Sequence, residues 1–371
     1  MGLNTNPSAP APHTIRPDAQ PQAPVRSAPV RSVPVQDGPG RNGRRALLLA
    51  ASLVVLALAC LASVAFGARS LSFGTVFDAL TAYDPSNGDH AVVLSRIPRT
   101  VLGLLAGGAL GLAGAAMQGV ARNPLADPGI LGVNAGAAFF VVLGIYGFGA
   151  YTFLGYIWFA LAGAALAAVL VYTVASLGRE GATPVKLALA GAALSAGLSS
   201  LMNAVLVSSQ QTLDVFRFWQ VGSISGRGWD VITAVLPFLA VGALITLAAG
   251  RALNGLSLGD DLARGLGQRV GLSRAVTALG VVLLCGTATA AAGPIGFVGL
   301  VIPHMVRSFT GPDYRWILPF SLVLAPVLLI IADIIGRLAL PPGEIPVGVM
   351  TAVIGAPVFI WLVRRRRQAQ L

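Results

Sequence analysis

The chain carries little charge, few cysteines and few histidines. Asp, Glu, Lys and Arg make up 11% of its 371 residues, whereas soluble domains usually carry about 25%. The two cysteines, Cys60 and Cys285, lie inside apolar runs, and the three histidines, His13, His90 and His304, are scattered. These residues offer neither a disulfide framework nor metal-ligand spacing, so we expect no metal site and no cofactor. The scarcity of clustered Asp, His and Cys also disfavours a membrane-embedded enzyme.

Lysine is almost absent. The chain has one, Lys186, in the stretch ATPVKLA, and no G-x-x-x-x-G-K-[ST] loop, so we predict no nucleotide site in this chain. Proton- or sodium-coupled carriers usually place carboxylates near the membrane midplane. The apolar runs carry none there, since Asp333 and Arg337 lie near the end of a run. A pump built on this chain would therefore draw its energy from another subunit.

Long apolar runs dominate the sequence. Hydrophobic residues make up 55% of the chain and the mean hydropathy is +0.78, values typical of a protein dissolved in lipid. Runs of spanning length follow one another and predict an all-α membrane protein of about ten transmembrane helices. We place these helices at residues 46–66, 99–119, 130–148, 153–177, 187–207, 231–250, 274–292, 296–309, 317–337 and 347–363.

The positions of the basic residues predict how the chain is oriented. If both termini are cytoplasmic, most of the 25 basic residues fall on the cytoplasmic side, as the positive-inside rule requires. The net charge of +11 is spread between apolar runs and not gathered on one basic face, which argues against nucleic-acid binding. The many Gly and Ala residues in the runs favour a compact helix bundle.

The first 45 residues differ from the rest of the chain. They are rich in Pro, Ala, Ser, Val and Arg and lack periodicity, so we predict a disordered cytoplasmic tail over 1–45 and a membrane domain over 46–367. The apolar run after the tail is too long for a typical signal peptide. We expect it to remain as the first membrane helix.

Three stretches are more specific than composition. The first is RIPRTVLGLLAGGALGLAGAAMQGVARNPLADPGILGVNAGAAF (96–139), and the second is LSLGDDLARGLGQRVG (256–271). The third begins with GPIGFVGLVIPHMVRSFTGPDYRWILPFS (293–321) and continues through ADIIGR (332–337) to PGEIPVGVMTAVIGAPVFIWLVRRR (342–366). In this order and spacing, the chain resembles the FecCD-type permeases over about residues 46–367. These are the membrane subunits of type II ABC importers for ferric siderophores, haem and cobalamin.

The resemblance implies a ten-helix permease subunit in the plasma or inner membrane. It implies a second permease subunit, identical or paralogous, two cytoplasmic ABC ATPase subunits and an extracytoplasmic substrate-binding protein. A ferric siderophore is the expected cargo, with haem or cobalamin as the alternative. A secondary transporter and a purely structural subunit of a larger complex are the remaining rival interpretations.

Arginines flank the second and ninth predicted helices on the outer side. Arg96 and Arg99 enclose a proline before the second helix, and Arg337 ends the ninth. Taken alone, such residues are often arginines whose side chains extend to lipid headgroups. The resemblance implies instead that they receive acidic residues of the binding protein, since charged rims steer docking and fix its orientation.

The cytoplasmic loop 253–272 has leucines at near-helical spacing. Asp260 and Asp261 stand where acidic residues favour a helix N-terminus, so the pattern predicts a short amphipathic helix pair. A helix lying on the membrane surface would show the same pattern. The resemblance implies that this loop couples to the ATPase through a groove on that subunit. The candidate coupling residues are Leu258, Asp260, Asp261, Leu262, Ala263, Leu266 and Gly267.

Polar side chains on otherwise apolar helices are candidates for a translocation path. Most such residues make hydrogen bonds between helices. The candidates are Gln118, Asn134, Ser195, Ser199 and Asn203. We interpret RNPLADP (122–128) as a sharp turn and His304 as a packing residue.

Overall fold

The computed structural model describes residue 2 and residues 39–178 and 182–368. The chain divides into two units, residues 1–42 and 43–371, and the second contains the bundle described below. The predicted tail therefore lies largely outside the described residues. Helix α1 begins at Pro39, six residues before the predicted end of the tail at residue 45.

The described residues form helices and connecting loops, with no strand among them. Ten of the helices overlap the ten apolar runs predicted above: α1 (Pro39–Ala65), α3 (Gly88–Val120), α4 (Val133–Phe148), α5 (Phe153–Ala175), α6 (Pro184–Ser208), α8 (Trp229–Ala248), α11 (Val270–Ala292), α12 (Val298–Thr310), α13 (Tyr314–Ala339) and α14 (Val347–Gln368). Shorter helices connect them: α2 (Phe73–Thr81), the 3-10 helix η1 (Pro128–Leu131), α7 (Gln210–Gln220), α9 (Gly250–Ser257) and α10 (Asp260–Gly265).

Within the described residues, seven helices are long and apolar enough to cross a membrane: α1, α3, α5, α6, α8, α11 and α13. Helix α4 and the Val347–Trp361 part of α14 are apolar but shorter, and α12 has 13 residues with Pro303 inside it. The all-helical membrane class is thus confirmed for this part of the chain. The count of ten crossings stays a prediction.

Local sequence explains where several helices begin. Ser72, Asn87, Thr152, Thr183 and Ser209 each accept a hydrogen bond from a backbone N–H in the first turn that follows. Such side chains satisfy backbone donors that have no partner within the helix. Polar caps of this kind mark the points where the chain leaves a loop and enters a helix.

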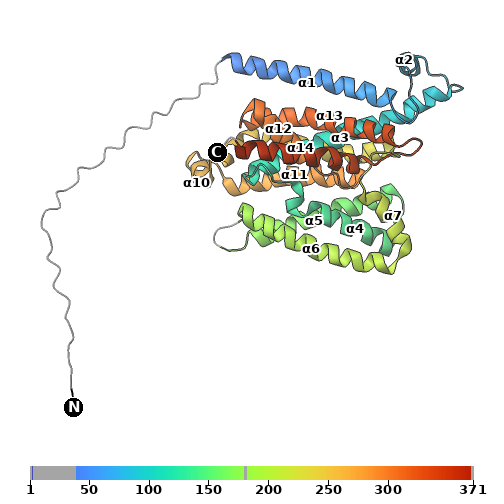
Figure 1. Cartoon of the computed structure of the whole chain (residues 1–371). Coiled ribbons are helices and arrows are strands. Elements are labelled where there is room, and N and C mark those ends of the chain that lie inside the picture. The colour runs from blue at the N-terminus through green and yellow to red at the C-terminus, as the bar shows by residue number, and fades with distance from the viewer. Residues whose placement is uncertain (1, 3–38, 179–181, 369–371) are drawn as a thin grey trace. The chain divides into compact units, whose positions relative to one another are not determined.

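Helix α3 lies at the centre of the unit and packs against α8, α11, α12 and α13 (Figure 1). Glycines let the helix backbones approach: a Cβ atom added to Gly114 would lie 1.9 Å from the carbonyl oxygen of Gly299 in α12. Helices α4, α5 and α6 form a neighbouring group, with α4 packed against both of the others. Lipid gives no hydrophobic drive to association, so such close contacts hold membrane helices together.

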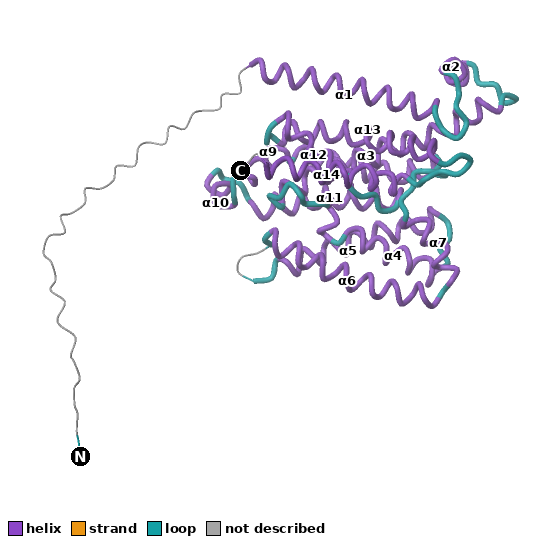
Figure 2. Tube along the Cα trace, in the orientation of Figure 1, coloured by secondary structure: helices purple, strands orange, loops and turns teal. Residues whose placement is uncertain are grey.

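Helix α1 is exposed along most of its length and is held near its two ends. Near its start, Arg45 Nη2 donates to the Thr310 carbonyl oxygen at 2.6 Å. Near its end, the Ser63 and Thr100 hydroxyls lie 2.8 Å apart. Figure 2 shows the loops gathered at two ends of the bundle, which we name the α2 end and the α10 end after the short helices there.

Candidate functional site

The three predicted docking arginines come together at the α2 end of the bundle. Arg96 and Arg99 lie in the first half of α3, and Arg337 lies in the last turn of α13. Helix α3 packs extensively against α13, so residues far apart in the sequence become neighbours. The structure also brings in two acidic residues that we did not predict as site residues, Asp333 and Glu344.

Arg99 is surrounded by acceptors. Its Nε and Nη2 atoms donate to the Asp333 carboxylate at 2.7–3.2 Å. Its Nη1 atom donates to the Ser225 hydroxyl at 3.1 Å and to Glu344 Oε2 at 2.7 Å. The Arg99 side chain is 14% exposed. Charge-assisted hydrogen bonds of this kind are stronger than neutral ones, so Arg99 is held in one orientation.

Asp333 joins two arginines inside the bundle. It is 1% exposed, and its Oδ2 atom lies 3.1 Å from Arg337 Nε, one helical turn along α13. Arg337 Nε lies within ion-pair distance but makes no hydrogen bond, because the geometry is unfavourable. The other nitrogens of Arg337 donate to the carbonyl and hydroxyl oxygens of Ser63 in α1. Asp333 and Arg337 thus connect α1, α3 and α13.

Arg96 donates its hydrogen bonds to backbone carbonyl oxygens. Its Nη1 atom donates to the carbonyl oxygens of Val64 and Ala65 at 2.8 and 2.9 Å, and Nη2 donates to the Arg69 carbonyl oxygen at 2.5 Å. Arg96 is 8% exposed and Arg337 4%. These two side chains therefore brace the end of α1 in the free chain, and direct docking through them stays a prediction.

Glu344 lies in the loop of residues 340–346 between α13 and α14, and its side chain is 38% exposed. Burial alone would raise its pKa, but hydrogen bonds from Ser225 and Arg99 outweigh burial and lower the pKa below the usual glutamate value. Glu344 is therefore ionised at neutral pH. A sequence signal existed, because Glu344 is the one acidic residue between the last two predicted spans.

The predicted coupling loop forms α9, α10 and the start of α11 at the other end of the bundle. Leu258, Leu262 and Leu266 are 56%, 63% and 71% exposed and recur every four residues. We name these three residues the leucine stripe. Leu256 and Val270, which fit the same sequence pattern, are buried. The structure thus separates residues that hold the loop on the bundle from residues that face outward.

The remaining coupling candidates also divide between inside and outside. Ala263 is fully buried and Asp261 fully exposed, and Gly267 has a φ of +79°, which favours glycine at the turn after α10. Asp260 faces inward: its carboxylate lies 2.8 Å from Arg274 Nη2 in α11 and 3.2 Å from Arg122 Nη2 after α3. Asp260 therefore fixes α10 to α11 and to the turn that follows α3.

The translocation-path candidates fall into two groups. Gln118 is buried and donates to the carbonyl oxygens of Gly299 and Leu300, and Asn134 accepts a 2.9 Å hydrogen bond from Thr289. Both therefore join helices. Ser195 and Ser199 are half-buried and Asn203 is exposed, all on α6, whose surface is among the least buried of the spanning helices.

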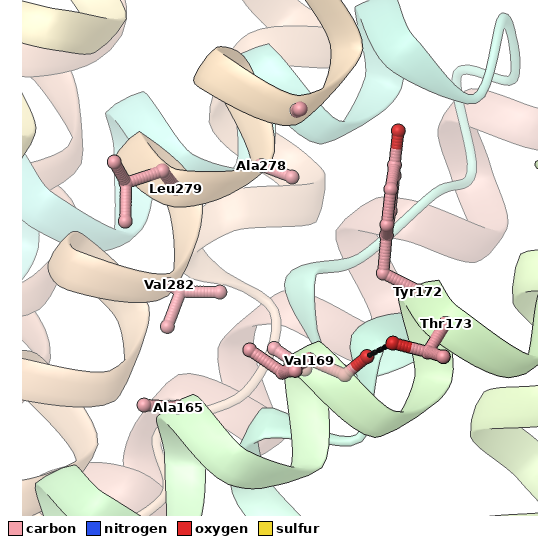
Figure 3. A pocket seen from close by; sticks show the side chains of 9 residues that line it. Ala165, Val169, Tyr172, Thr173, Ala278, Leu279 and Val282 are labelled. Atoms are coloured by element: carbon pink, nitrogen blue, oxygen red, sulfur yellow. Dashed lines mark hydrogen bonds between the residues drawn. The ribbon is translucent and has the colours of Figure 1, made fainter. Parts of the chain in front are cut away.

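An apolar cavity of about 230 Å³ lies between α5 and α11 (Figure 3). Ala165, Val169, Leu279 and Val282 form much of its wall, and Tyr172 is its one ionisable residue. Within the described part of the chain, no group of three or more His, Cys, Asp or Glu residues is placed to hold a metal ion. The lining of this cavity does not gather the polar groups that a reaction needs.

Comparison with known proteins gives consistent matches. The FecCD transport family matches residues 55–365. The chain is 47% identical over 323 residues to the ferric enterobactin transport system permease protein FepD of Escherichia coli (strain K12), covering 87% of this chain and 96% of that protein. It is 41% identical over 323 residues to the iron(3+)-hydroxamate import system permease protein FhuB of Bacillus subtilis (strain 168), covering 87% and 84%.

A solved structure supports the same fold. An inward-facing conformation of a metal-chelate type ABC transporter has a TM-score of 0.75 and 29% sequence identity to this chain. The match covers 86% of this chain and 99% of the other.

Proposed function

The chain belongs to the FecCD transport family, and from this premise we propose that it is the membrane-spanning permease subunit of an ABC importer for a ferric siderophore. The structural observation that carries the proposal is the leucine stripe, an apolar surface without a partner in the described chain. A chain without a nucleotide-binding motif needs a surface for an external ATPase. We propose that ATP is hydrolysed by two such separate subunits.

We propose that the α10 end is cytoplasmic and the α2 end faces outward, with ten crossings and both termini inside. Arg122, Arg251, Arg264, Arg269 and Arg274 all lie at or near the α10 end, which supports this orientation by the positive-inside rule. Residues 46–367 then form the permease domain, within which residues 253–272 form the coupling loop.

The leucine stripe is proposed to enter a groove of the ATPase. An amphipathic helix in a groove is a common recognition mode. Here the short helix α10 carries Leu262, and Leu258 and Leu266 lie in the turns that flank it. Asp260 would pass the motion of α10 to α3 and α11 through Arg122 and Arg274. The residues proposed to carry coupling are Leu258, Asp260, Asp261, Leu262, Ala263, Leu266 and Gly267.

Replacing Leu262 by serine is expected to lower ATP-driven uptake about tenfold while the protein level in the membrane stays normal, because an exposed anchor is lost without opening the core. Leu177→Ser is the control, since Leu177 is an equally exposed leucine in the loop after α5. Uptake and copurification of the ATPase are measured together. Equal loss in both variants would remove the coupling assignment.

The α2 end is proposed to receive the substrate-binding protein. Arg99 is the most accessible of the three predicted docking arginines. Arg96 and Arg337 would act mainly by fixing α1 and α13 around it. A second permease subunit would complete the translocation path, with Ser195, Ser199 and Asn203 of α6 as its proposed lining and Gln118 and Asn134 as supports between helices.

The substrate class rests on the relatives. FepD and FhuB are named for ferric enterobactin and for iron(3+)-hydroxamate, which supports a ferric siderophore above haem or cobalamin. Uptake of ⁵⁵Fe-labelled siderophores is compared with uptake of haem and of cobalamin, each carrying its own label. The cells carry the complete transporter and are tested with and without ATP depletion. If only haem or only cobalamin is taken up, the substrate assignment changes to that compound. Uptake that is driven by an ion gradient without ATP would support the secondary-transporter interpretation instead.

Arg99→Gln is expected to lower siderophore uptake at least about tenfold, because truncating one member of a hydrogen-bonded charge pair costs about 2–5 kcal/mol of binding. Arg99→Lys should recover only part of the loss, since lysine lacks the paired donors of a guanidinium. The permease level is measured in the same membranes. Normal uptake by Arg99→Gln at normal protein level would end the docking role of Arg99.

A further inference from the structure

Arg99 differs from its neighbours in the kind of partners that it has. Arg96 binds backbone oxygens, and Arg337 binds Ser63 and the buried Asp333. Arg99 alone is shared between a buried carboxylate and one that is 38% exposed, Glu344. An acidic side chain of a partner that approaches Arg99 therefore finds its most exposed side already occupied by Glu344 of this chain.

The two carboxylates differ in how firmly they are held. Asp333 is 1% exposed and lies between two arginines, so removing it would leave buried charge without compensation. Glu344 reaches Arg99 through one nitrogen, Nη1. An ion pair that is partly exposed contributes little to stability. Glu344 is thus the partner of Arg99 that can be exchanged at small cost.

The backbone that follows Glu344 is fixed. The Ile345 N–H donates to the Gly336 carbonyl oxygen at 3.0 Å, and the Gly348 N–H donates to the Gly222 carbonyl oxygen at 3.0 Å. Glu344 can therefore leave Arg99 by rotation of its own side chain. Arg99 would stay aimed, because Asp333 holds Nε and Nη2 and Ser225 accepts from Nη1.

We propose that Glu344 occupies the docking site of the binding protein in the free permease, and that a carboxylate of the binding protein displaces it from Arg99 Nη1. This inference rests on the docking proposed above. The exchange replaces one ion pair by another of the same chemistry. Docking through Arg99 then gains less affinity than it would if Glu344 were absent, which favours a partner that must bind and leave in each transport cycle.

The proposal is distinguishable from a purely positioning role of Glu344. If Glu344 competes with the binding protein, Glu344→Gln frees a charged donor and strengthens docking. If Glu344 only orients Arg99, the same change loosens Arg99 and weakens docking. Asp214→Asn is the matched control, because it also removes a partly exposed acidic partner of an arginine, Arg217, in α7 of the same end.

The probe is the photocrosslinking residue p-benzoylphenylalanine, placed at the exposed Leu340, the first residue of the loop that carries Glu344. Irradiated cells carrying the complete transporter yield an adduct whose partner is identified by mass spectrometry. That protein is then purified and titrated against permease variants in nanodiscs. We expect Glu344→Gln to lower the dissociation constant about two- to fivefold, the range of one partly exposed ion pair, and Asp214→Asn to leave it unchanged.

Each outcome decides a different claim. An unchanged or raised dissociation constant for Glu344→Gln would overturn the exchange, even if docking through Arg99 stands. An equal gain for Asp214→Asn would assign the effect to general charge and also overturn it. Absence of a wild-type adduct, or wild-type affinity of Arg99→Gln, would remove the docking proposal itself, and the exchange with it.

Discussion

Replacing Gly114 by alanine is expected to prevent normal accumulation of folded protein, although the change adds a single methyl group. The new Cβ atom would lie 1.9 Å from the Gly299 carbonyl oxygen and 2.5 Å from the Gly299 Cα atom. Both neighbours are backbone atoms, so relief requires α3 and α12 to separate. Overpacking usually costs about 1–3 kcal/mol, and a backbone clash at the centre of the bundle falls at or above the upper end.

The control for this prediction is Gly147→Ala in α4. The glycine at 147 is helical, and nothing lies within 4 Å of an added Cβ atom. Alanine also favours the helix by up to about 1 kcal/mol relative to glycine. Membrane level and thermal unfolding in detergent are measured for both variants. Similar unfolding temperatures would show that α3 and α12 do not approach through Gly114.

Asp333→Asn is expected to destabilise the permease by about 3–5 kcal/mol, the usual cost of breaking a buried ion pair from one side. The carboxylate is 1% exposed and faces both Arg99 and Arg337. An amide cannot compensate two guanidinium charges, and its own N–H donors would face other donors. Thermal unfolding of purified protein reports the loss, and Asp333→Glu should recover part of it by restoring the charge.

Asp214→Asn is also the comparison for this effect. The ion pair of Asp214 with Arg217 is exposed on both sides, so its loss should cost at most about 1 kcal/mol. The ratio between the two variants matters more than either value. If Asp333→Asn and Asp214→Asn lowered the unfolding temperature equally, Asp333 would not hold the helices together. Its position as a buried partner of two arginines would then be contradicted.

The predicted apolar runs anticipated the helices because each run is continuous and bounded by loop residues. The runs did not reveal α2 and α7, since these amphipathic helices are too short to span and depend on packing at the bundle surface. The start of α1 at Pro39 was missed because composition alone marked residues 39–45 as part of the tail. Local sequence is weakest at such boundaries.

The candidate sites show a similar division. The sequence singled out Arg96, Arg99 and Arg337 as docking candidates, which stays a prediction, but it did not show that Arg96 and Arg337 are buried, because burial depends on where α1 ends against α3. Asp333 had a usable signal in its four-residue spacing from Arg337. The contact of Glu344 with Arg99 joins residues 245 positions apart, and no local pattern in one sequence encodes it.

If Arg99 receives the binding protein as proposed, the arrangement around it separates the residues that keep the protein folded from the residue that faces the partner. Asp333 and Arg337 lie inside α13 and cannot change independently, whereas Glu344 lies in a loop whose backbone is held directly after it, at Ile345. A change of residue 344 leaves the helix contacts intact. On the docking proposed above, partner choice would be free to diverge between duplicated permeases, or to be redesigned in the laboratory, through the loop alone, without a compensating change in the bundle.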